Sequence, residues 1–444
     1  MKNSGKIKAL EKQMERWYPL IHHDGQQAYY LDILTRIHRF IVNPSGRRSG
    51  KTEMPKRALS RLMMGNGQVG PYLFGAPTEG QAKKIFWEDL KQLTLSASHP
   101  RKPNETEKII FLPNGSEAHV CGLESSERIE GIPWVYALID EFGNLKPDVW
   151  PEHLRPALST IFPGGYQAGA TLCGVPEGLN HYYDLAEYAK SEIDLDWGYY
   201  HWLSAELLKE SDILEAKRTL SPMQYRQEYE GSFETVSGRI YPDFSSENVS
   251  RATLHENDQI IWTHDQNKTP MCSAVITEKE PEIYHIVDEL VLESAQPKNV
   301  GLEFVDRYKN HKNRVVKLYG DPYGNIGSKH GHRSYYHIVT DILQAHGFEV
   351  INNVKKSHPS IEDRQNSLRA LICNMLSERR FFVNPEKAKW SYKGLSTVQV
   401  KKDSAFQEDE KNQYHHITTA IGYWSETEFP VEGNDEVEFY DSFF

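Results

Sequence analysis

A run of eight residues near the N-terminus has the types and spacing of a nucleotide-phosphate site. The run is Ser45-Gly-Arg-Arg-Ser-Gly-Lys-Thr52, which follows a short apolar stretch and precedes a helix-compatible run. In the pattern GxxxxGK[ST], the glycines let backbone N–H groups wrap phosphates, the lysine reaches the β- and γ-phosphates, and the hydroxyl holds Mg²⁺. Ser45 stands where the pattern has its first glycine. We expect ATP and Mg²⁺ to be bound here by Ser45, Gly46, Ser49, Gly50, Lys51 and Thr52.

A second segment supplies the acids that such a site needs. Val135-Tyr-Ala-Leu-Ile-Asp-Glu141 is an apolar strand candidate that ends in two carboxylates. Asp140 would hold Mg²⁺ through its water ligands, and Glu141 would orient and deprotonate the attacking water. Taken alone, the segment is also compatible with an ordinary strand that ends in solvated acids. Together with the phosphate loop upstream, it predicts hydrolysis rather than kinase chemistry.

Arginines and glutamines complete the predicted nucleotide site. A fixed guanidinium stabilises the charge that spreads over a phosphoryl group during transfer. Arg47 and Arg48 lie inside the loop, and Arg128 is a third candidate that would act on a neighbouring subunit. A surface ion pair is the alternative for each arginine. Gln26 or Gln27 would contact the adenine edge, and the sequence does not choose between them.

Two further aspartates are placed for metal-dependent hydrolysis. Asp265 follows a strand candidate at residues 259–264, and Asp321 follows another at residues 315–319, in Tyr-Gly-Asp-Pro. Hydrolysis of phosphodiesters by paired metal ions needs carboxylates that converge on Mg²⁺ or Mn²⁺. Each aspartate alone is also a common turn residue. The pair is therefore a candidate for a second metal site.

Length and composition limit the class of protein that positions these residues. The chain has 444 residues, a formal net charge of −11, 39% hydrophobic residues and 25% charged residues, which indicates two or three globular domains. No apolar run is long enough to span a membrane, and the first residues lack the apolar core of a secretory signal. The four cysteines have no CxxC spacing, which argues against a disulfide scaffold or a zinc site. A soluble intracellular protein is expected.

The predicted elements separate into two units. In the first, apolar strand candidates alternate with helical spacing, which predicts an α/β domain with a mainly parallel sheet. Its strand candidates are residues 39–45, 71–77, 134–139 and 170–174, with a helix at 79–93 and a hairpin formed by 108–115 and 118–122. The second unit begins near residue 250. Its strand candidates are residues 259–264, 272–277, 284–292 and 315–319, and its helix candidates are 334–345 and 361–378.

Taken in order, these motifs resemble the large terminase subunit of tailed bacteriophages. The resemblance covers roughly residues 15–425 and rests on the GRRSGKT loop, the LIDE strand end and several later segments. Those segments are Gln227-Glu-Tyr-Glu-Gly-Ser-Phe233, Gly238-Arg-Ile-Tyr-Pro-Asp-Phe244, His264-Asp-Gln-Asn-Lys-Thr-Pro-Met271, Gly320-Asp-Pro322 and His416-Ile-Thr-Thr-Ala-Ile-Gly-Tyr423. Any one of them alone would be a weak signal, whereas their common order is specific.

The resemblance implies an α/β chain with two domains. A P-loop (RecA/ASCE-like) ATPase domain with a parallel sheet would be followed by a ribonuclease H-like mixed-sheet nuclease domain, in which the strands before Asp265 and Asp321 are neighbours. The expected parts are an N-terminal helical segment at 1–24, the ATPase domain at 25–235 with a lid subdomain at about 180–235, a linker at 236–250, the nuclease domain at 251–428 and an acidic tail at 429–444.

The resemblance also implies a function and a set of partners. The ATPase would drive double-stranded DNA into a procapsid, and the nuclease, with two Mg²⁺ or Mn²⁺ ions, would cut the concatemer. The implied partners are the portal protein, the small terminase subunit and further copies of the chain, arranged as a homopentamer on the procapsid, with a monomer as an alternative form in solution. No membrane is involved. The implied location is the host cytoplasm, transiently at the portal vertex, and not the mature virion.

The sequence departs from the family pattern at two positions. Val175 stands where the family often has a Ser or Thr that couples hydrolysis to motion, so Thr171 or the backbone would have to substitute. Thr419 stands where the family usually has the third nuclease acid. Threonine is a poor ligand for a hard cation, so either one metal is bound weakly or another acid substitutes. The candidate acids are Asp403, Glu408, Asp409, Glu410 and Asp288.

Charge is distributed unevenly along the chain. Between Lys309 and Lys402 there are 17 Lys or Arg against 7 Asp or Glu, a net charge of +10, which leaves −21 for the rest. A concentrated cationic stretch is what phosphate binding requires, so this stretch is the expected DNA contact. Its candidate residues are Lys355, Lys356, Arg364, Arg369, Arg379 and Arg380, with Trp390 and Tyr392 as possible stacking partners. A solvated helix face with core aromatics is the alternative.

Two other functions remain open at this stage. One is a helicase-like DNA-remodelling ATPase whose C-terminal domain binds DNA without cutting it, which the missing third acid favours. The other is a DNA- or capsid-binding adaptor without catalytic activity, against which the intact Gly-Lys-Thr and Asp-Glu motifs argue.

Overall fold

The computed structural model describes residues 23–430, apart from residues 66, 96–98, 235–237, 267–269, 294–295, 327–332, 402–403 and 405. The expected N-terminal helical segment and acidic tail therefore lie almost entirely outside the described residues. By contacts the chain divides into two compact units. The first extends to Ile213 and includes Arg226–Glu234, and the second comprises Leu214–Tyr225 and the chain from Thr235 onward. Residues 214–225, part of the expected lid segment, thus group with the second unit.

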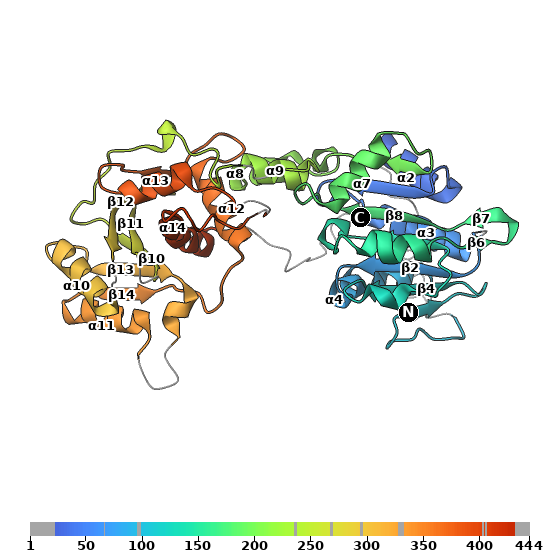
Figure 1. The fold of residues 1–444 in the computed structure, drawn as a ribbon, viewed down its shortest axis with the longest axis horizontal. Coiled ribbons are helices and arrows are strands. Elements are labelled where there is room, and N and C mark those ends of the chain that lie inside the picture. The colour runs from blue at the N-terminus through green and yellow to red at the C-terminus, as the bar shows by residue number, and fades with distance from the viewer. Residues whose placement is uncertain are drawn as a thin grey trace, which may run out of the picture. The chain divides into compact units, whose positions relative to one another are not determined.

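The first unit is built on a seven-stranded sheet in the order β3-β4-β2-β5-β8-β1-β9 (Figure 1). All neighbouring pairs are parallel except the β3–β4 hairpin. The strands are β1 (Phe40–Pro44), β2 (Pro71–Ala76), β3 (Ile109–Phe111), β4 (Glu117–Gly122), β5 (Tyr136–Ile139), β8 (Gly169–Gly174) and β9 (Trp197–Tyr199). The expected parallel sheet and the hairpin expected from residues 108–115 and 118–122 are both confirmed. β8 lies between the strands that carry the phosphate loop and the Asp-Glu pair.

The central strands are covered on both faces, because their successive side chains enter two different cores. Ile41 and Leu138 pack in a core with α2 (Asp24–Thr35), α3 (Glu53–Met64) and α5 (Glu88–Leu93). Val42 and Ile139 pack in the other core, which includes α7 (His181–Lys190). A strand that is buried on both faces has no polar alternation, which is why these strands are continuous apolar runs in the sequence.

The remaining elements of the first unit are short. The expected helix at 79–93 is confirmed, although its middle is a π-helical turn: α4 (Glu79–Ala82) continues through Lys83–Trp87 into α5. A small hairpin, β6 (Ile161–Phe162) with β7 (Tyr166–Gln167), follows α6 (Arg155–Ala157). The chain then passes through α8 (Glu210–Thr219) and α9 (Pro222–Tyr229).

The second unit is built on a six-stranded mixed sheet in the order β14-β13-β10-β11-β12-β15 (Figure 1). Three antiparallel strands come first in the chain. β13 then pairs in parallel with β10, and β14 pairs in parallel with β13. The strands are β10 (Ile260–Asp265), β11 (Met271–Glu280), β12 (Ile283–Leu292), β13 (Val315–Gly320), β14 (Glu349–Asn352) and β15 (Phe381–Val383). This arrangement confirms the expected ribonuclease H-like sheet and the adjacency of the strands before Asp265 and Asp321.

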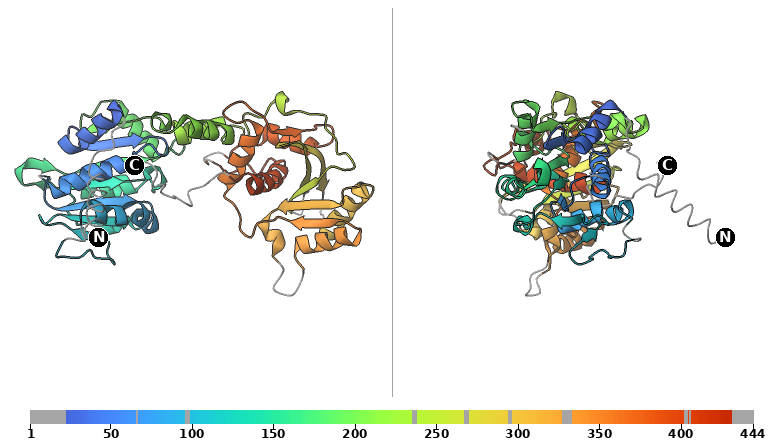
Figure 2. Two further views of the ribbon diagram at one scale, coloured as in Figure 1. Left: turned by 180° about the vertical axis from the view of Figure 1, so that it is seen from behind. Right: turned by 90° about the vertical axis from the view of Figure 1, so that its right-hand side faces the viewer.

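Helices cover both faces of this sheet as well, as the reverse view in Figure 2 shows. α10 (Pro297–Tyr308) and α11 (Tyr335–Ala345) form one core with β10 and β13, and α12 (Ile361–Ile372), α13 (Lys389–Thr397) and α14 (His415–Glu428) form the other. The helix expected at 361–378 ends at Ile372, because Cys373 is extended and the side chain of Asn374 closes a turn by accepting from Leu376 N and Glu378 N. Among the described residues, no helix has the length and apolar character to cross a bilayer.

The helix α14 is anchored by Trp424. This side chain is fully buried and lies 5.7 Å from the ring of Phe381 on β15 and 5.1 Å from the ring of Tyr284 on β12. Because α14 also carries His416, which contacts Asp265, the anchor fixes one side of the candidate metal site.

We expect Trp424→Ala to destabilise the second unit by about 3–5 kcal/mol, since it removes a large buried side chain and leaves a cavity. Denaturant unfolding followed by far-UV circular dichroism measures the change. Leu302→Ala, at a position that is 41% exposed, is the control and should cost far less. Equal losses in the two variants would contradict the anchoring role.

Candidate functional site

The loop between β1 and α3 meets the end of β5 at a polar contact. Thr52 Oγ1 donates a hydrogen bond to Asp140 Oδ1 at 2.9 Å, and Cys173 Sγ on the intervening strand β8 lies 3.3 Å from the same oxygen. Arg48 and Gly50 have positive φ angles of 54° and 75°, so the loop reverses direction tightly before α3. The structure therefore brings together the hydroxyl and the carboxylate that were predicted to share a cation.

The loop is closed on itself by Lys51. Its Nζ lies 3.3 Å from Gly46 O, and the side chain is buried within the loop. Residues of α2 hold the loop from outside: Tyr29 Oη donates to Lys51 O at 3.3 Å, and Gln26 Nε2 donates to Ser49 O at 3.1 Å. Gln26 is fully buried against the loop, whereas Gln27 is exposed. Of the two glutamines, only Gln26 contacts the phosphate loop among the described residues.

Sequence reasoning missed a second set of loop contacts, which comes from residues 202–206 and from the end of α9. Trp202 donates through its backbone N to Ser45 Oγ at 3.2 Å and through Nε1 to Ser49 O at 2.7 Å. Ser204 Oγ donates to Arg47 O at 2.7 Å. A Cβ at Gly46 would lie 2.3 Å from Ser204 Oγ and 2.5 Å from Tyr229 O, so only glycine fits there. These contacts lie in irregular chain, where no periodicity signals them.

The three predicted arginines have different surroundings. Arg47 pairs with Glu228 on α9, with 3.2 Å between Nε and Oε2, and its backbone N donates to Glu228 O. Arg48 is exposed at the tip of the loop. Arg128 is exposed on the short 3₁₀ turn Ser126–Ile129 after β4, two strands away from β5. The loop thus carries one paired and one exposed guanidinium, and Arg128 faces solvent.

Glu141 has an unusual backbone and an unusual environment. Its φ and ψ are 50° and 44°, the left-handed region, which costs a non-glycine residue about 1–2 kcal/mol. Burial raises the pKa of the Glu141 carboxyl to about 7, and the charge of Asp140 adds to this, while Lys51 and Arg47 act in the opposite direction. A carboxylate with its pKa near neutrality is well suited to exchange a proton with water. Perturbed acids of this kind cluster at functional sites, which makes Glu141 a candidate functional residue.

In the second unit, the two predicted aspartates lie at the same edge of the sheet. His264 on β10 pairs in register with Gly320 on β13, and Asp321 N donates to His264 O at 3.2 Å, so Asp265 and Asp321 follow directly on adjacent strands. Asp265 is nearly fully buried, and its Oδ2 lies 2.9 Å from His416 Nδ1. Asp321 Oδ1 lies 3.4 Å from His358 Nε2.

The electrostatics of this pair fit a divalent cation. Burial raises the pKa of Asp321, and the charge of Asp265 raises it further, whereas the backbone N–H of Tyr323 and the charges of His358 and Arg364 lower it. A buried carboxylate such as Asp265 and a half-buried one such as Asp321 repel each other, and a cation bound between them would offset that repulsion. Their oxygens are the hard ligands that Mg²⁺ and Mn²⁺ prefer.

Glu408 is the candidate acid that contacts Thr419, the residue at the position of the missing third acid. Thr419 Oγ1 on α14 donates to Glu408 Oε2 at 3.1 Å, one helical turn from His416. Gln365 Nε2 on α12 donates a hydrogen bond to Glu408 Oε1 at 3.3 Å. Of the other candidates, Glu410 is exposed, Asp409 accepts from the backbone N of Lys411, and Asp403 lies outside the described residues. Among the described residues, no three His, Cys, Asp or Glu are already placed to hold a metal ion together.

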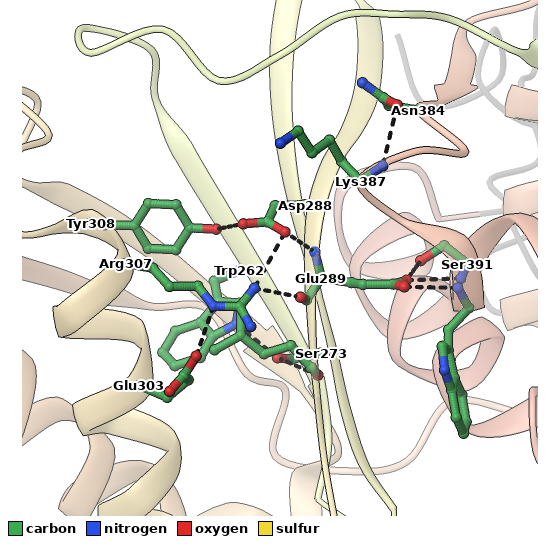
Figure 3. A network of polar contacts seen from close by, with 12 residues as sticks. Trp262, Ser273, Asp288, Glu289, Glu303, Arg307, Tyr308, Asn384, Lys387 and Ser391 are labelled. Carbon is green, nitrogen blue, oxygen red and sulfur yellow. Dashed lines mark hydrogen bonds and ion pairs between the residues drawn. The ribbon is translucent and has the colours of Figure 1, made fainter.

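Asp288 is not part of this site (Figure 3). It lies on β12 and accepts a hydrogen bond from Tyr308 Oη at 2.6 Å, on the face that α10 covers. Arg307 on the same helix lies 3.3 Å from Asp288 Oδ1. The next residue, Glu289, points to the opposite face, where it accepts from the backbone N atoms of Trp390 and Ser391 at the start of α13. Asp288 therefore has a structural role on the other side of the sheet from α14.

The basic stretch is less available than its charge suggests. Arg369 is 2% exposed and donates to Ile240 O, Asn366 Oδ1 and Gln365 Oε1, and burial lowers its pKa to about 10. Arg379 pairs with Glu247 at 2.6 Å, and Lys355 pairs with Glu426 at 2.6 Å. Several residues counted as DNA contacts are thus occupied inside the unit, and Arg369 is a core residue. Lys356 is exposed.

This chain is similar to known proteins in sequence and in fold. Residues 45–149 match the family model described as terminase large subunit, T4likevirus-type, N-terminal. The terminase large subunit of Escherichia phage T5 is 26% identical over 215 residues, a match that spans 47% of this chain and about half (47%) of that protein. The large terminase of a thermophilic bacteriophage superposes with a TM-score of 0.58 and 14% identity, over 90% of this chain and 98% of that one. The same thermophilic phage protein in complex with ADP gives a TM-score of 0.56 at 15% identity, over 90% of this chain and 98% of that one.

The chain has the fold of a large terminase, a P-loop ATPase-type sheet followed by a ribonuclease H-type sheet. The resemblance to the large terminase subunits of tailed bacteriophages that the motifs predicted is confirmed by these matches.

The close approach at Gly46 gives a testable consequence. We expect Gly46→Ala to lower the stability of the first unit by about 1–3 kcal/mol, because its Cβ would overlap Ser204 Oγ and the backbone of Tyr229. Thermal unfolding measures the effect. Gly80→Ala is the matched control, since nothing lies within 4 Å of the added Cβ and helical alanine is favourable. Identical melting curves for Gly46→Ala and wild type would show that the contact is not close in solution.

Proposed function

We propose that this chain is the large subunit of a viral DNA-packaging motor. It would couple ATP hydrolysis to translocation of double-stranded DNA into a procapsid and would cut concatemeric DNA with a metal-dependent endonuclease. The observation that carries the proposal is the joint presence, in one chain, of the Lys51–Thr52–Asp140–Glu141 constellation and the Asp265–Asp321 pair on the two sheets of a large-terminase fold.

The ATPase half follows from the chemistry of its residues. Loop amides and Lys51 would hold the phosphates, and Thr52 and Asp140 would hold Mg²⁺, which supplies charge neutralisation at the β- and γ-phosphates when it is bound. Glu141 would accept a proton from the attacking water, since its carboxyl has a pKa of about 7. Arg47 would reach the γ-phosphate after leaving Glu228. The large terminase of the thermophilic bacteriophage, which has been solved with ADP and with ATP-γ-S, supports a nucleotide site in this fold.

The nuclease half is supported by the carboxylate pair and its partners. Asp265 and Asp321 would hold one or two Mg²⁺ or Mn²⁺ ions, which activate water and neutralise phosphate charge when they are bound. His416 and His358 orient the two acids from α14 and from the segment before α12. Glu408, presented by Thr419, would supply the third carboxylate.

The partners follow from the same proposal. Double-stranded DNA would be bound without sequence preference by exposed cations of the second unit such as Lys356, while the portal protein, the small terminase subunit and further copies of the chain would assemble with it on the procapsid. Arg128, exposed on the first unit, would act on the nucleotide of a neighbouring copy. The host cytoplasm is the proposed location.

Two variants separate the two proposed activities. Lys51→Ala should reduce ATP hydrolysis by at least 100-fold, because Lys51 is the residue proposed to hold the phosphates. It should leave Mn²⁺-dependent plasmid cleavage intact, because the proposed nuclease site lies on the sheet of the second unit. Asp321→Ala should abolish cleavage and leave ATP hydrolysis intact. Initial rates of phosphate release and gel assays of supercoiled plasmid measure the two activities.

Each failure has a distinct meaning. Cleavage by Asp321→Ala at the wild-type rate would contradict the nuclease site. Absence of cleavage in the wild type, with intact ATP hydrolysis and DNA binding, would favour the remodelling ATPase that binds DNA without cutting it.

Glu408 gives a prediction that does not depend on cleavage. We expect Glu408→Gln to weaken Mn²⁺ binding to the metal-free protein by about tenfold, because a charged oxygen ligand is replaced by a neutral one. Electron paramagnetic resonance of free Mn²⁺ during titration measures the affinity. Glu410→Gln, at an exposed neighbouring position, is the matched control and should bind as wild type does. Equal affinities for both variants and wild type would exclude Glu408 as a ligand.

A further inference from the structure

The short turn that carries Glu141 is held by the N-terminus of α7. This turn, Phe142–Asn144, is a single 3₁₀ turn that begins directly after Glu141. Asn180 Nδ2 donates a hydrogen bond to Gly143 O at 2.9 Å, and His181 Nε2 lies 3.2 Å from Phe142 O. The rings of His181 and Phe142 also contact each other, with 5.2 Å between their centres. Two consecutive carbonyls of the turn therefore have partners from one helix end.

Asn180 makes hydrogen bonds in two directions. It is the N-cap of α7, and its Oδ1 accepts from Tyr182 N at 2.9 Å and from Tyr183 N at 3.4 Å. Its amide nitrogen donates to the turn after Glu141. Tyr182 extends the connection, because its buried ring packs on Phe142 and its hydroxyl donates to Leu172 O on β8. Asn180 and Tyr182 therefore connect the start of α7 both to the turn after Glu141 and to β8.

The backbone of Glu141 needs such support. A left-handed conformation at a glutamate persists only where the surrounding structure determines it, because the isolated residue disfavours it. The end of β8 packs close to the same place: a Cβ at Gly174 would lie 3.0 Å from Phe142 N and 3.2 Å from Glu141 Cα. The orientation of the Glu141 carboxylate therefore depends on how this turn is held.

Thr171 was expected to substitute for the hydroxyl missing at position 175, but the structure engages its side chain elsewhere. Its Oγ1 lies 2.8 Å from Tyr136 Oη on β5, so it is occupied inside the sheet. Val175 itself offers no polar side chain. Asn180 and His181 make polar connections between the segment after β8 and the turn after Glu141, and Glu177 adds a side-chain hydrogen bond to Asn144.

We propose that Asn180, assisted by His181, is a positioning residue for Glu141 and provides in this chain a polar connection between the strand-end acid and the segment after β8. This inference rests on the proposed ATPase function. Asn180 acts through the carbonyl of Gly143 and does not touch the nucleotide. Its loss should therefore slow hydrolysis without weakening nucleotide binding.

Asn180→Ser is the main test, because serine keeps a neutral N-cap acceptor for α7 and removes the donor to Gly143 O. We expect kcat for ATP hydrolysis to fall at least tenfold, with KM and the affinity for a fluorescent ADP analogue within twofold of wild type. His181→Ala should also lower kcat, and His181→Gln, which retains a donor, should restore most of it. If Asn180→Ser lowers the melting temperature strongly, Asn180→Asp serves as the second cap-preserving variant.

Asn114→Ser is the matched control. Asn114 makes the same two kinds of backbone hydrogen bond, donating from Nδ2 to Met63 O and accepting from Ser116 N, but it lies in the β3–β4 turn. Its substitution should affect stability as Asn180→Ser does and leave kcat unchanged.

A double-mutant cycle with Glu141→Gln decides whether Asn180 acts through Glu141. If it does, adding Asn180→Ser to Glu141→Gln causes no further loss of the residual hydrolysis. The inference is overturned if Asn180→Ser lowers hydrolysis by the same factor in the wild-type and Glu141→Gln backgrounds, or if Asn180→Ser alone has the wild-type kcat. In either case, hydrolysis that is lost in Lys51→Ala still supports the proposed ATPase function. A wild-type chain without Lys51-dependent hydrolysis overturns the ATPase function and this inference with it.

Discussion

The contact between Thr52 Oγ1 and Asp140 Oδ1 is the constraint on which the first unit depends. The two residues are 88 positions apart in the chain, and their side chains meet at 2.9 Å only because β1, β8 and β5 are parallel and in fixed register. Parallel strands end at the same edge of a sheet, so residues that follow different strands converge there. A one-residue slip of β8 against either neighbour would invert its side chains and separate the loop from the acid. The phosphate loop, Glu141 and the start of α7 all take their places from this alignment.

The second unit uses the same geometric rule with a different set of side chains. The register of His264 with Gly320 places Asp265 and Asp321 side by side at the ends of β10 and β13. Here the neighbouring helix contributes His416 and Thr419 rather than a further acid, and the carboxylate beside Thr419 comes from Glu408 in the preceding segment. Under the proposed function, the third carboxylate would come from this loop rather than from α14, on the same sheet.

The sequence predicted the central strands and the candidate ligands after them, because these features are marked by continuous apolar runs and the polar residues at their ends. Central strands such as β5 and β10 are buried on both faces, so they are visible as uninterrupted apolar segments, and the polar residues directly after them are visible as candidate ligands. Trp202 and Ser204 were missed because they lie in irregular chain with no period, although both contact the phosphate loop. Charge counting likewise failed for Arg369, since a sum over a segment does not show which guanidinium is turned into the core. The end of α12 was placed too late because Asn374 closes its turn through side-chain bonds that composition does not reveal.

The left-handed backbone conformation of Glu141 lowers the stability of the folded chain at the position where the proposed chemistry needs a carboxylate. Glycine would adopt that conformation without steric cost, and asparagine would tolerate it, so either replacement would favour the folded chain through the backbone alone. Both would remove the only group at that position able to accept a proton. Under the proposed ATPase function, the residue that the backbone favours least is the one that the chemistry requires, so activity and stability make opposite demands on this position.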